Sequence, residues 1–168
     1  MALVTSPQTI PDLNYEYYTI NIDSIGQDSA NNFTCHLENP IHNVVQARLI
    51  AAHIHTLDTT EHIYVSIEEL DSNFNDRASN VYNGQSSLSK LRGCFASMIT
   101  SAVDHGVASY LQVFKDDYPI VTQYVNPIRT ISRFTVKIYD QSGNLLLPDD
   151  VTDSNHLIIK FICRKPNL

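Results

Sequence analysis

Strict alternation of apolar and polar residues is the feature that most limits how this chain can fold. Ile63, Val65 and Ile67 alternate with His62, Tyr64 and Ser66, and the same period recurs at 18–22, 33–37 and 134–138. A period of two places alternate side chains on opposite faces of a β-sheet, whereas a helix needs apolar groups every three to four residues. The sequence therefore predicts a protein built from strands.

The run 44–56 is the stretch where a helix competes with a strand. Its alanines would support a helix, and its apolar residues occupy both parities, as in a strand that is buried on both faces. Val44, Val45 and Ile54 are β-branched and no clean helical period is present, so a strand is favoured.

Shorter strands at 95–100, 109–114, 118–124 and 157–163 are separated by turn signals. Strand breaks are expected at Asn39-Pro40, Asp116-Asp117 and Asn126-Pro127. The count of about eight strands, with no helices between them, predicts an all-β fold, namely a two-sheet β-sandwich or a barrel.

Length and composition predict one domain. The chain has 168 residues, of which 43% are hydrophobic and 17% charged, which is ordinary for an ordered globular protein. Residues 1–14 contain Pro7 and Pro11 and are expected to form an extended N-terminal arm. The domain then covers 15–168, with a long polar surface loop at about 71–90.

Charge and cysteine content limit the partners and the compartment. A formal charge of -7 disfavours direct nucleic-acid binding, and Arg164-Lys165 with nearby Lys160 is only a small basic group. Three cysteines without CxxC spacing indicate free thiols and synthesis in a reducing compartment such as the cytosol. The sequence contains neither a signal peptide pattern nor an apolar run long enough for a membrane span.

Few residues point to catalysis. His53 and His55 share one face of a strand and lie near Asp58 and His62, so they are the candidate metal ligands. Histidines at a surface or an interface are the favoured interpretation, because no glycine lies close by as in cupin-type sites. No nucleophile elbow, GxGxxG or P-loop is present. We therefore expect no catalytic residue, no cofactor, and a protein that is not an enzyme.

The order and spacing of several segments resemble a viral family. They are Tyr18-Thr19-Ile20-Asn21-Ile22-Asp23-Ser24, Asn32-Phe33-Thr34-Cys35-His36-Leu37, Pro40-Ile41-His42-Asn43-Val44, Arg48-Leu49-Ile50, Ile131-Ser132-Arg133-Phe134-Thr135-Val136-Lys137-Ile138-Tyr139-Asp140, Gly143-Asn144 and Asn155-His156. Together they span most of the chain and resemble the single jelly-roll penton or minor capsid proteins of virophages, polinton-like viruses and nucleocytoplasmic large DNA viruses.

The resemblance implies an eight-stranded antiparallel β-sandwich of the single jelly-roll type. It also implies a structural role in the virion of a double-stranded DNA virus, with synthesis in the host cytoplasm. A penton of this family forms a homopentamer at the icosahedral five-fold vertex and contacts double jelly-roll major capsid proteins, with other minor capsid proteins as further neighbours. The N-terminal arm would then supply contacts between subunits through its apolar residues, which are Leu3, Val4, Ile10 and Leu13.

Three other functions stay open. The chain could be another minor capsid or cement protein. It could be a soluble carbohydrate- or protein-binding module, which would be favoured if Tyr15, Tyr17, Tyr82 and Tyr110 were exposed on one concave face. A metal enzyme of the cupin type would require metal at His53 and His55.

Overall fold

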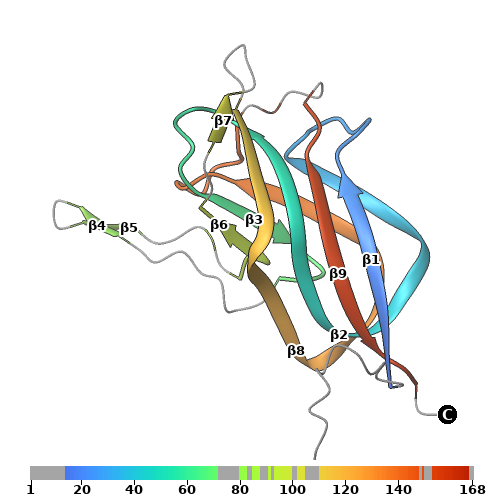
Figure 1. Cartoon of the computed structure of the whole chain (residues 1–168). Helices are drawn as coiled ribbons and strands as arrows, with labels where there is room; N and C mark the ends of the chain where they lie inside the picture. The colour runs from blue at the N-terminus through green and yellow to red at the C-terminus, as the bar shows by residue number, and fades with distance from the viewer. Residues whose placement is uncertain are drawn as a thin grey trace, which may run out of the picture.

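The described part of the chain is entirely β and antiparallel. The computed structural model describes residues 14–71, 80–82, 85–87, 91, 93–99, 102–104, 110–147, 149 and 153–166, and none of them is helical. The strands are β1 (Tyr15–Asp23), β2 (Asn32–Thr56), β3 (Ile63–Ile67), β4 (Asn80–Tyr82), β5 (Gln85–Ser87), β6 (Ala96–Met98), β7 (Ala102–Asp104), β8 (Tyr110–Tyr139) and β9 (His156–Arg164). The main sheet curls into a half-barrel (Figure 1).

The main sheet has seven strands and a simple pairing pattern. Its order is β1-β9-β2-β8-β3-β6, and β7 pairs with β8 beside this path. Strands β4 and β5 form a separate two-stranded hairpin inside the predicted 71–90 loop, so that segment is not wholly a loop. No helix in the described part of the chain is long and apolar enough to cross a membrane.

The three expected strand breaks are instead irregularities inside two long, bent strands. Pro40 lies in β2 at a register shift, and Pro127 lies in β8 at another. The Asp116-Asp117 pair falls at a third shift, between Lys115 and Ile120. Proline cannot donate to the ladder, but at a bulge its missing N–H is not needed, so the strand bends and continues. The prediction that these positions end strands was wrong.

Because β2 and β8 bend, each of them pairs in two different parts of the sheet. The first part of β2, residues 32–44, pairs with residues 128–137 of β8. The second part, residues 46–56, pairs with residues 110–123 of β8 on one side and with β9 on the other.

The run 44–56 is a strand, as predicted, but it is buried on one face only. The buried positions are Val44, Ala47, Leu49, Ala52, Ile54 and Thr56, in steps of three, two, three, two and two. The steps of three coincide with the register shifts at 44–46 and 49–51. Each bulge adds one residue and changes the parity that faces the core. The apolar residues of 44–56 therefore occupy both parities of the sequence although only one face of the strand is buried.

The core lies against the concave face of the curled sheet. Phe95, Phe134 and Phe161 are fully buried, and the last two rings stack at 5.6 Å between centroids. The alternating burial of β9 continues through Cys163, which together with Cys35 and Cys94 is a free thiol. Burial of each large apolar side chain contributes about 1.5–3 kcal/mol, so this cluster fixes the curl of the sheet.

Candidate interaction surface

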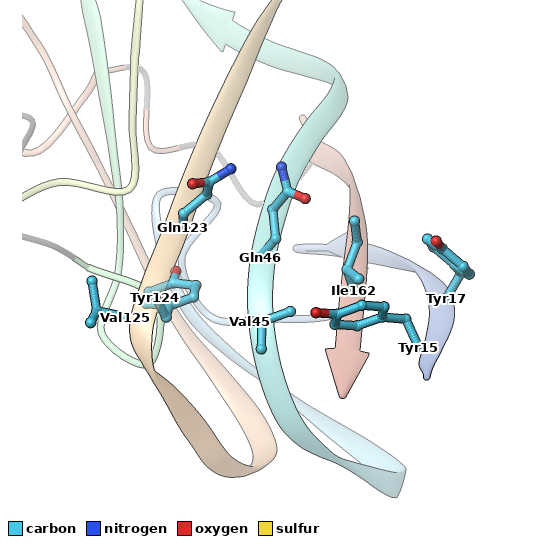
Figure 2. A pocket seen from close by; sticks show the side chains of 8 residues that line it. All are labelled: Tyr15, Tyr17, Val45, Gln46, Gln123, Tyr124, Val125 and Ile162. Carbon is cyan, nitrogen blue, oxygen red and sulfur yellow. The ribbon is translucent and has the colours of Figure 1, made fainter. Parts of the chain in front are cut away.

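A groove crosses four strands near the end of the sheet where β1 begins. It has a volume of about 390 Å³ and lies over β8, β2, β9 and β1 (Figure 2). Its lining residues are Tyr15, Tyr17, Val45, Gln46, Gln123, Tyr124, Val125 and Ile162. We call it the tyrosine groove. Val125 is 96% exposed and Tyr17 is 53% exposed.

Strand register explains how residues so distant in sequence meet here. Gln46 pairs with Gln123 of β8 on one side and with Ile162 of β9 on the other. Ile162 in turn pairs with Tyr17 of β1, so one row runs across all four strands. Lys160 places its ammonium 5.4 Å from the centre of the Tyr17 ring, which holds that ring at the surface by a cation–π contact.

Strand β1 leaves one edge of the sheet without a partner in the described part of the chain. It is nine residues long and pairs with β9 on one side only. Edge strands are usually protected by lysine, proline or bulges, because their free N–H and C=O groups recruit other strands. Strand β1 contains neither lysine nor proline, and its pairing with β9 is regular over all nine positions.

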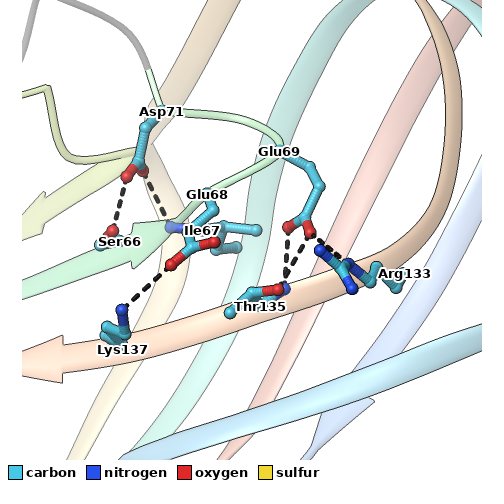
Figure 3. A network of polar contacts seen from close by, with 8 residues as sticks. All are labelled: Ser66, Ile67, Glu68, Glu69, Asp71, Arg133, Thr135 and Lys137. Atoms are coloured by element: carbon cyan, nitrogen blue, oxygen red, sulfur yellow. Dashed lines mark hydrogen bonds and ion pairs between the residues drawn. The ribbon is translucent and has the colours of Figure 1, made fainter.

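A second polar cluster anchors the turn after β3. The Asp71 carboxylate accepts hydrogen bonds from Ser66 Oγ at 2.5 Å, from the Ile67 N–H at 2.8 Å and from the Phe95 N–H at 3.0 Å. Burial raises the pKa of Asp71, although these three hydrogen bonds act in the opposite direction. Figure 3 shows the carboxylate turned toward Ser66 and the Ile67 N–H. Because its three hydrogen bonds join the turn after β3 to Phe95, Asp71 has a structural role.

Glu68 and Glu69 tie the same turn to β8. Glu69 accepts bonds from the Thr135 N–H at 2.8 Å and hydroxyl at 3.0 Å, and Arg133 Nε lies 3.5 Å away (Figure 3). Glu68 pairs with Lys137 Nζ at 3.0 Å. These adjacent carboxylates point to separate basic partners, so they do not form an acid and base pair.

A buried asparagine joins three segments at the other end of β1. Asn155 is 1% exposed, and its amide donates to the Ala30 carbonyl at 3.0 Å and to Asn31 Oδ1 at 2.7 Å. Its Oδ1 accepts from the His55 N–H at 2.8 Å, and its own N–H donates to Ser24 Oγ at 2.9 Å. Asparagine is required here because the site needs two donors and one acceptor.

The predicted metal ligands are separated from one another by their partners. His55 Nδ1 lies 3.7 Å from Asp153 Oδ2, and the neighbouring candidate His53 is exposed on the same face of β2. His62 bonds Ser97 through Nε2 at 2.7 Å and stacks on Tyr64. Within the described residues, no group of three or more His, Cys, Asp or Glu is arranged to hold a metal ion.

The predicted arm contacts Leu3, Val4, Ile10 and Leu13 lie outside the described residues, as do the side chains of Tyr82 and Tyr110. Asn14, which was assigned to the arm, joins the domain: its carbonyl accepts from the Lys165 N–H at 2.9 Å.

The tyrosine groove was only partly visible in the sequence. Tyr15 and Tyr17 are candidate exposed aromatics in the sequence, whereas nothing there points to Val125, which lies in the register shift of β8 between Gln123 and Ile128. Such a shift carries no clear sequence signal. A scan against models of known protein families gave no match, and a search of curated proteins found no similar sequence.

Proposed function

We propose that the chain is a single jelly-roll capsid protein that forms the homopentameric penton of a double-stranded DNA virus. The observation that carries the proposal is the strand order. When β2 and β8 are each divided at their bends, one half of the sheet reads β1, β9, residues 46–56 and residues 110–123. The other half reads residues 32–44, residues 128–139, β3 and β6.

This order supports a jelly roll for a topological reason. Eight principal strands fall into two groups of four, and consecutive strands along the chain mostly lie in different groups. A jelly roll has this distribution, and it is common among viral capsid domains, although lectins and cupins share it. The fold therefore supports a shell protein without selecting it, and the choice depends on the surface.

The surface favours contacts between subunits. A closed ring requires two different patches on each copy, which meet head to tail. One patch is the tyrosine groove, which runs from Tyr17 on the edge strand β1 to Val125 on β8, and both side chains are exposed. The other is the opposite edge of the sheet at β6, which is followed by Ile99 with 79% of its surface exposed. Exposed apolar side chains in both patches are suited to be covered by a neighbouring subunit.

The solution mass tests this proposal first. Light scattering over a range of concentration and ionic strength should give about five times the chain mass of 18.9 kDa. Val125→Glu and Ile99→Glu should each release monomers, because a buried unpaired carboxylate would oppose association. The control is Ile25→Glu, since Ile25 is 61% exposed and follows the far end of β1. Pentamers that survive both edge substitutions would reject the proposed contacts.

The N-terminal arm has a separate test. Deletion of residues 2–13 should weaken the pentamer if Leu3, Val4, Ile10 and Leu13 clamp a neighbour. Unchanged assembly after this deletion would reject the arm as a clamp, and the edge contacts would still stand. A mass of one chain at every concentration, with no incorporation beside the major capsid protein, would remove the penton function itself.

A binding module is the second candidate, because Tyr15 and Tyr17 line one groove. Aromatic rings in a groove can stack on sugar rings or on peptide side chains. Titration of the monomeric Ile99→Glu protein, whose substitution lies outside the groove, with a panel of glycans, followed by NMR, distinguishes this function. Saturable shifts confined to the tyrosine groove would favour the module, and their absence would favour assembly.

A further inference from the structure

A basic pocket lies at the end of the sheet where β1 begins and β9 ends, and we propose that it binds a polyphosphate, the shared chemistry of inorganic polyphosphates and nucleotide phosphate tails. The pocket has a volume of about 670 Å³, and its lining residues are Glu16, Tyr18, His42, Asn43, Arg129, Arg164 and Pro166. A smaller pocket of about 250 Å³ adjoins it, shares Asn43 and Arg164, and adds Lys165. The proposal does not depend on the capsid role.

Strand register brings the two arginines to either side of one residue. His42 and Val44 of β2 pair with Thr130 and Ile128 of β8, which places Arg129 opposite Asn43. On the other side Val44 pairs with Cys163 of β9, so Arg164 follows next to Asn43. The sequence showed only the terminal pair Arg164-Lys165 as basic, and the fold adds Arg129 and His42 to it.

Asn43 has the backbone conformation that shapes this corner. Its φ of 53° is in the left-handed region, and it is the only non-glycine residue in the described part of the chain with a positive φ. Asparagine tolerates this conformation better than most residues, and such positions often occur at functional sites. His42, one residue earlier, is oriented by a contact of 3.1 Å between its Nδ1 and Thr130 Oγ1.

The pocket is positively charged, whereas the whole chain carries a net negative charge. The whole protein carries a formal charge of -7, yet Arg129, Arg164 and Lys165 line these two adjoining pockets. None of the three takes part in an ion pair with another described residue. Glu16 is the one carboxylate among the described lining residues, and its Oε2 accepts a 2.8 Å hydrogen bond from the Tyr18 hydroxyl. Three permanent cations against one carboxylate leave a net positive site.

The number and type of cations indicate the ligand. An arginine fork binds two phosphate oxygens at once, and two forks flanking a single residue can hold adjacent phosphoryl groups. Three cations are too few for the broad basic surface on which nucleic-acid binding depends, and the rest of the chain is acidic. A small ligand with two or three phosphates therefore fits better than a nucleic-acid strand.

Titration calorimetry with sodium tripolyphosphate at low salt tests the site in the full chain. The wild-type protein should bind one tripolyphosphate per chain, and Arg129→Gln and Arg164→Gln should each weaken binding about tenfold, because each removes a charged hydrogen-bonding group. Arg133→Gln is the matched control: it removes the same charge from an exposed arginine whose partner is Glu69, outside this pocket. Equal losses in all three variants would mean diffuse attraction and overturn the proposal.

Two further measurements keep the test independent of folding defects. Glu16→Gln should tighten tripolyphosphate binding several-fold by removing the opposing carboxylate. In the wild-type protein, NMR should show tripolyphosphate shifting the Nε–H signals of Arg129 and Arg164 but not that of Arg133. If tripolyphosphate does not bind at a concentration of about 10 mM, which would detect even a very weak site, the proposal is rejected.

Competition identifies the source of the phosphate. Displacement of tripolyphosphate by a nucleoside triphosphate at equal concentration supports a nucleotide, and its failure supports an inorganic polyphosphate. A single-stranded oligonucleotide that binds more tightly than either, with a steep salt dependence, would overturn the assignment to a small ligand.

Discussion

The buried asparagine at position 155 provides a sharp test of how this sheet is closed. Its side chain makes three hydrogen bonds, to the Ala30 carbonyl, to Asn31 Oδ1 and to the His55 N–H. Each neutral hydrogen bond contributes about 0.5–1.5 kcal/mol net, and a buried group that loses its partner costs about 1–3 kcal/mol. We therefore expect Asn155→Ala to lower the free energy of unfolding by about 3 kcal/mol.

Thermal unfolding followed by circular dichroism measures this effect. For a domain of this length, about 3 kcal/mol corresponds to a fall in Tm of about 6–12 °C. The control is Asn144→Ala, because Asn144 is exposed and bonds Asp140 through its backbone N–H and carbonyl. Its Tm should move by less than about 2 °C. A comparable fall in both variants, or no fall in Asn155→Ala, would refute the reasoning.

Asn155→Asp provides the electrostatic half of the same test. A carboxylate there would face two acceptor oxygens, the Ala30 carbonyl and Asn31 Oδ1, and would retain only the His55 N–H as a donor. Repulsion and burial would raise the folded pKa of the new carboxyl group. The variant should therefore be less stable than Asn155→Ala at neutral pH and recover as the pH falls, because protonation restores one donor. A variant whose stability does not change with pH would contradict this geometry.

Four further predictions follow from other positions. Phe161→Ala should cost about 3–5 kcal/mol in urea unfolding, since the ring is fully buried and stacks on Phe134, and a loss below 1 kcal/mol, roughly that of a surface site, would contradict the core. Burial raises the pKa of Cys163 to about 11, so iodoacetamide should leave it unmodified at pH 8 in the folded protein, and rapid alkylation detected by mass spectrometry would show that the core opens. Gly26→Ala should cost about 1 kcal/mol in urea unfolding from backbone strain alone, because φ is 73° and no atom lies within 4 Å of an added Cβ. Burial raises the pKa of Asp71 in the folded state, so the wild-type protein should lose stability relative to Asp71→Asn as the pH rises through that pKa. Thermal unfolding over a range of pH measures the slope. The opposite slope would show that the three hydrogen bonds to Asp71 outweigh its burial.

The sequence by itself determined the all-β class, since the period of two in 63–67 and 157–163 is a local property that no distant contact is needed to reveal. It also located β1 and the 44–56 strand. It failed at Pro40, Asp116-Asp117 and Pro127, because a turn residue that ends a strand and one that sits in a bulge look alike until the partner strand is known.

The candidate surfaces could be predicted only in fragments. Tyr15, Tyr17 and Arg164 stood out in the sequence, whereas Val125 and Arg129 did not. Those two residues reach the tyrosine groove and the basic pocket because a register shift in β8 between Gln123 and Ile128 bends that strand across β2. Register is a property of paired strands, set by which apolar residues meet in the core, so only the tertiary structure could decide it.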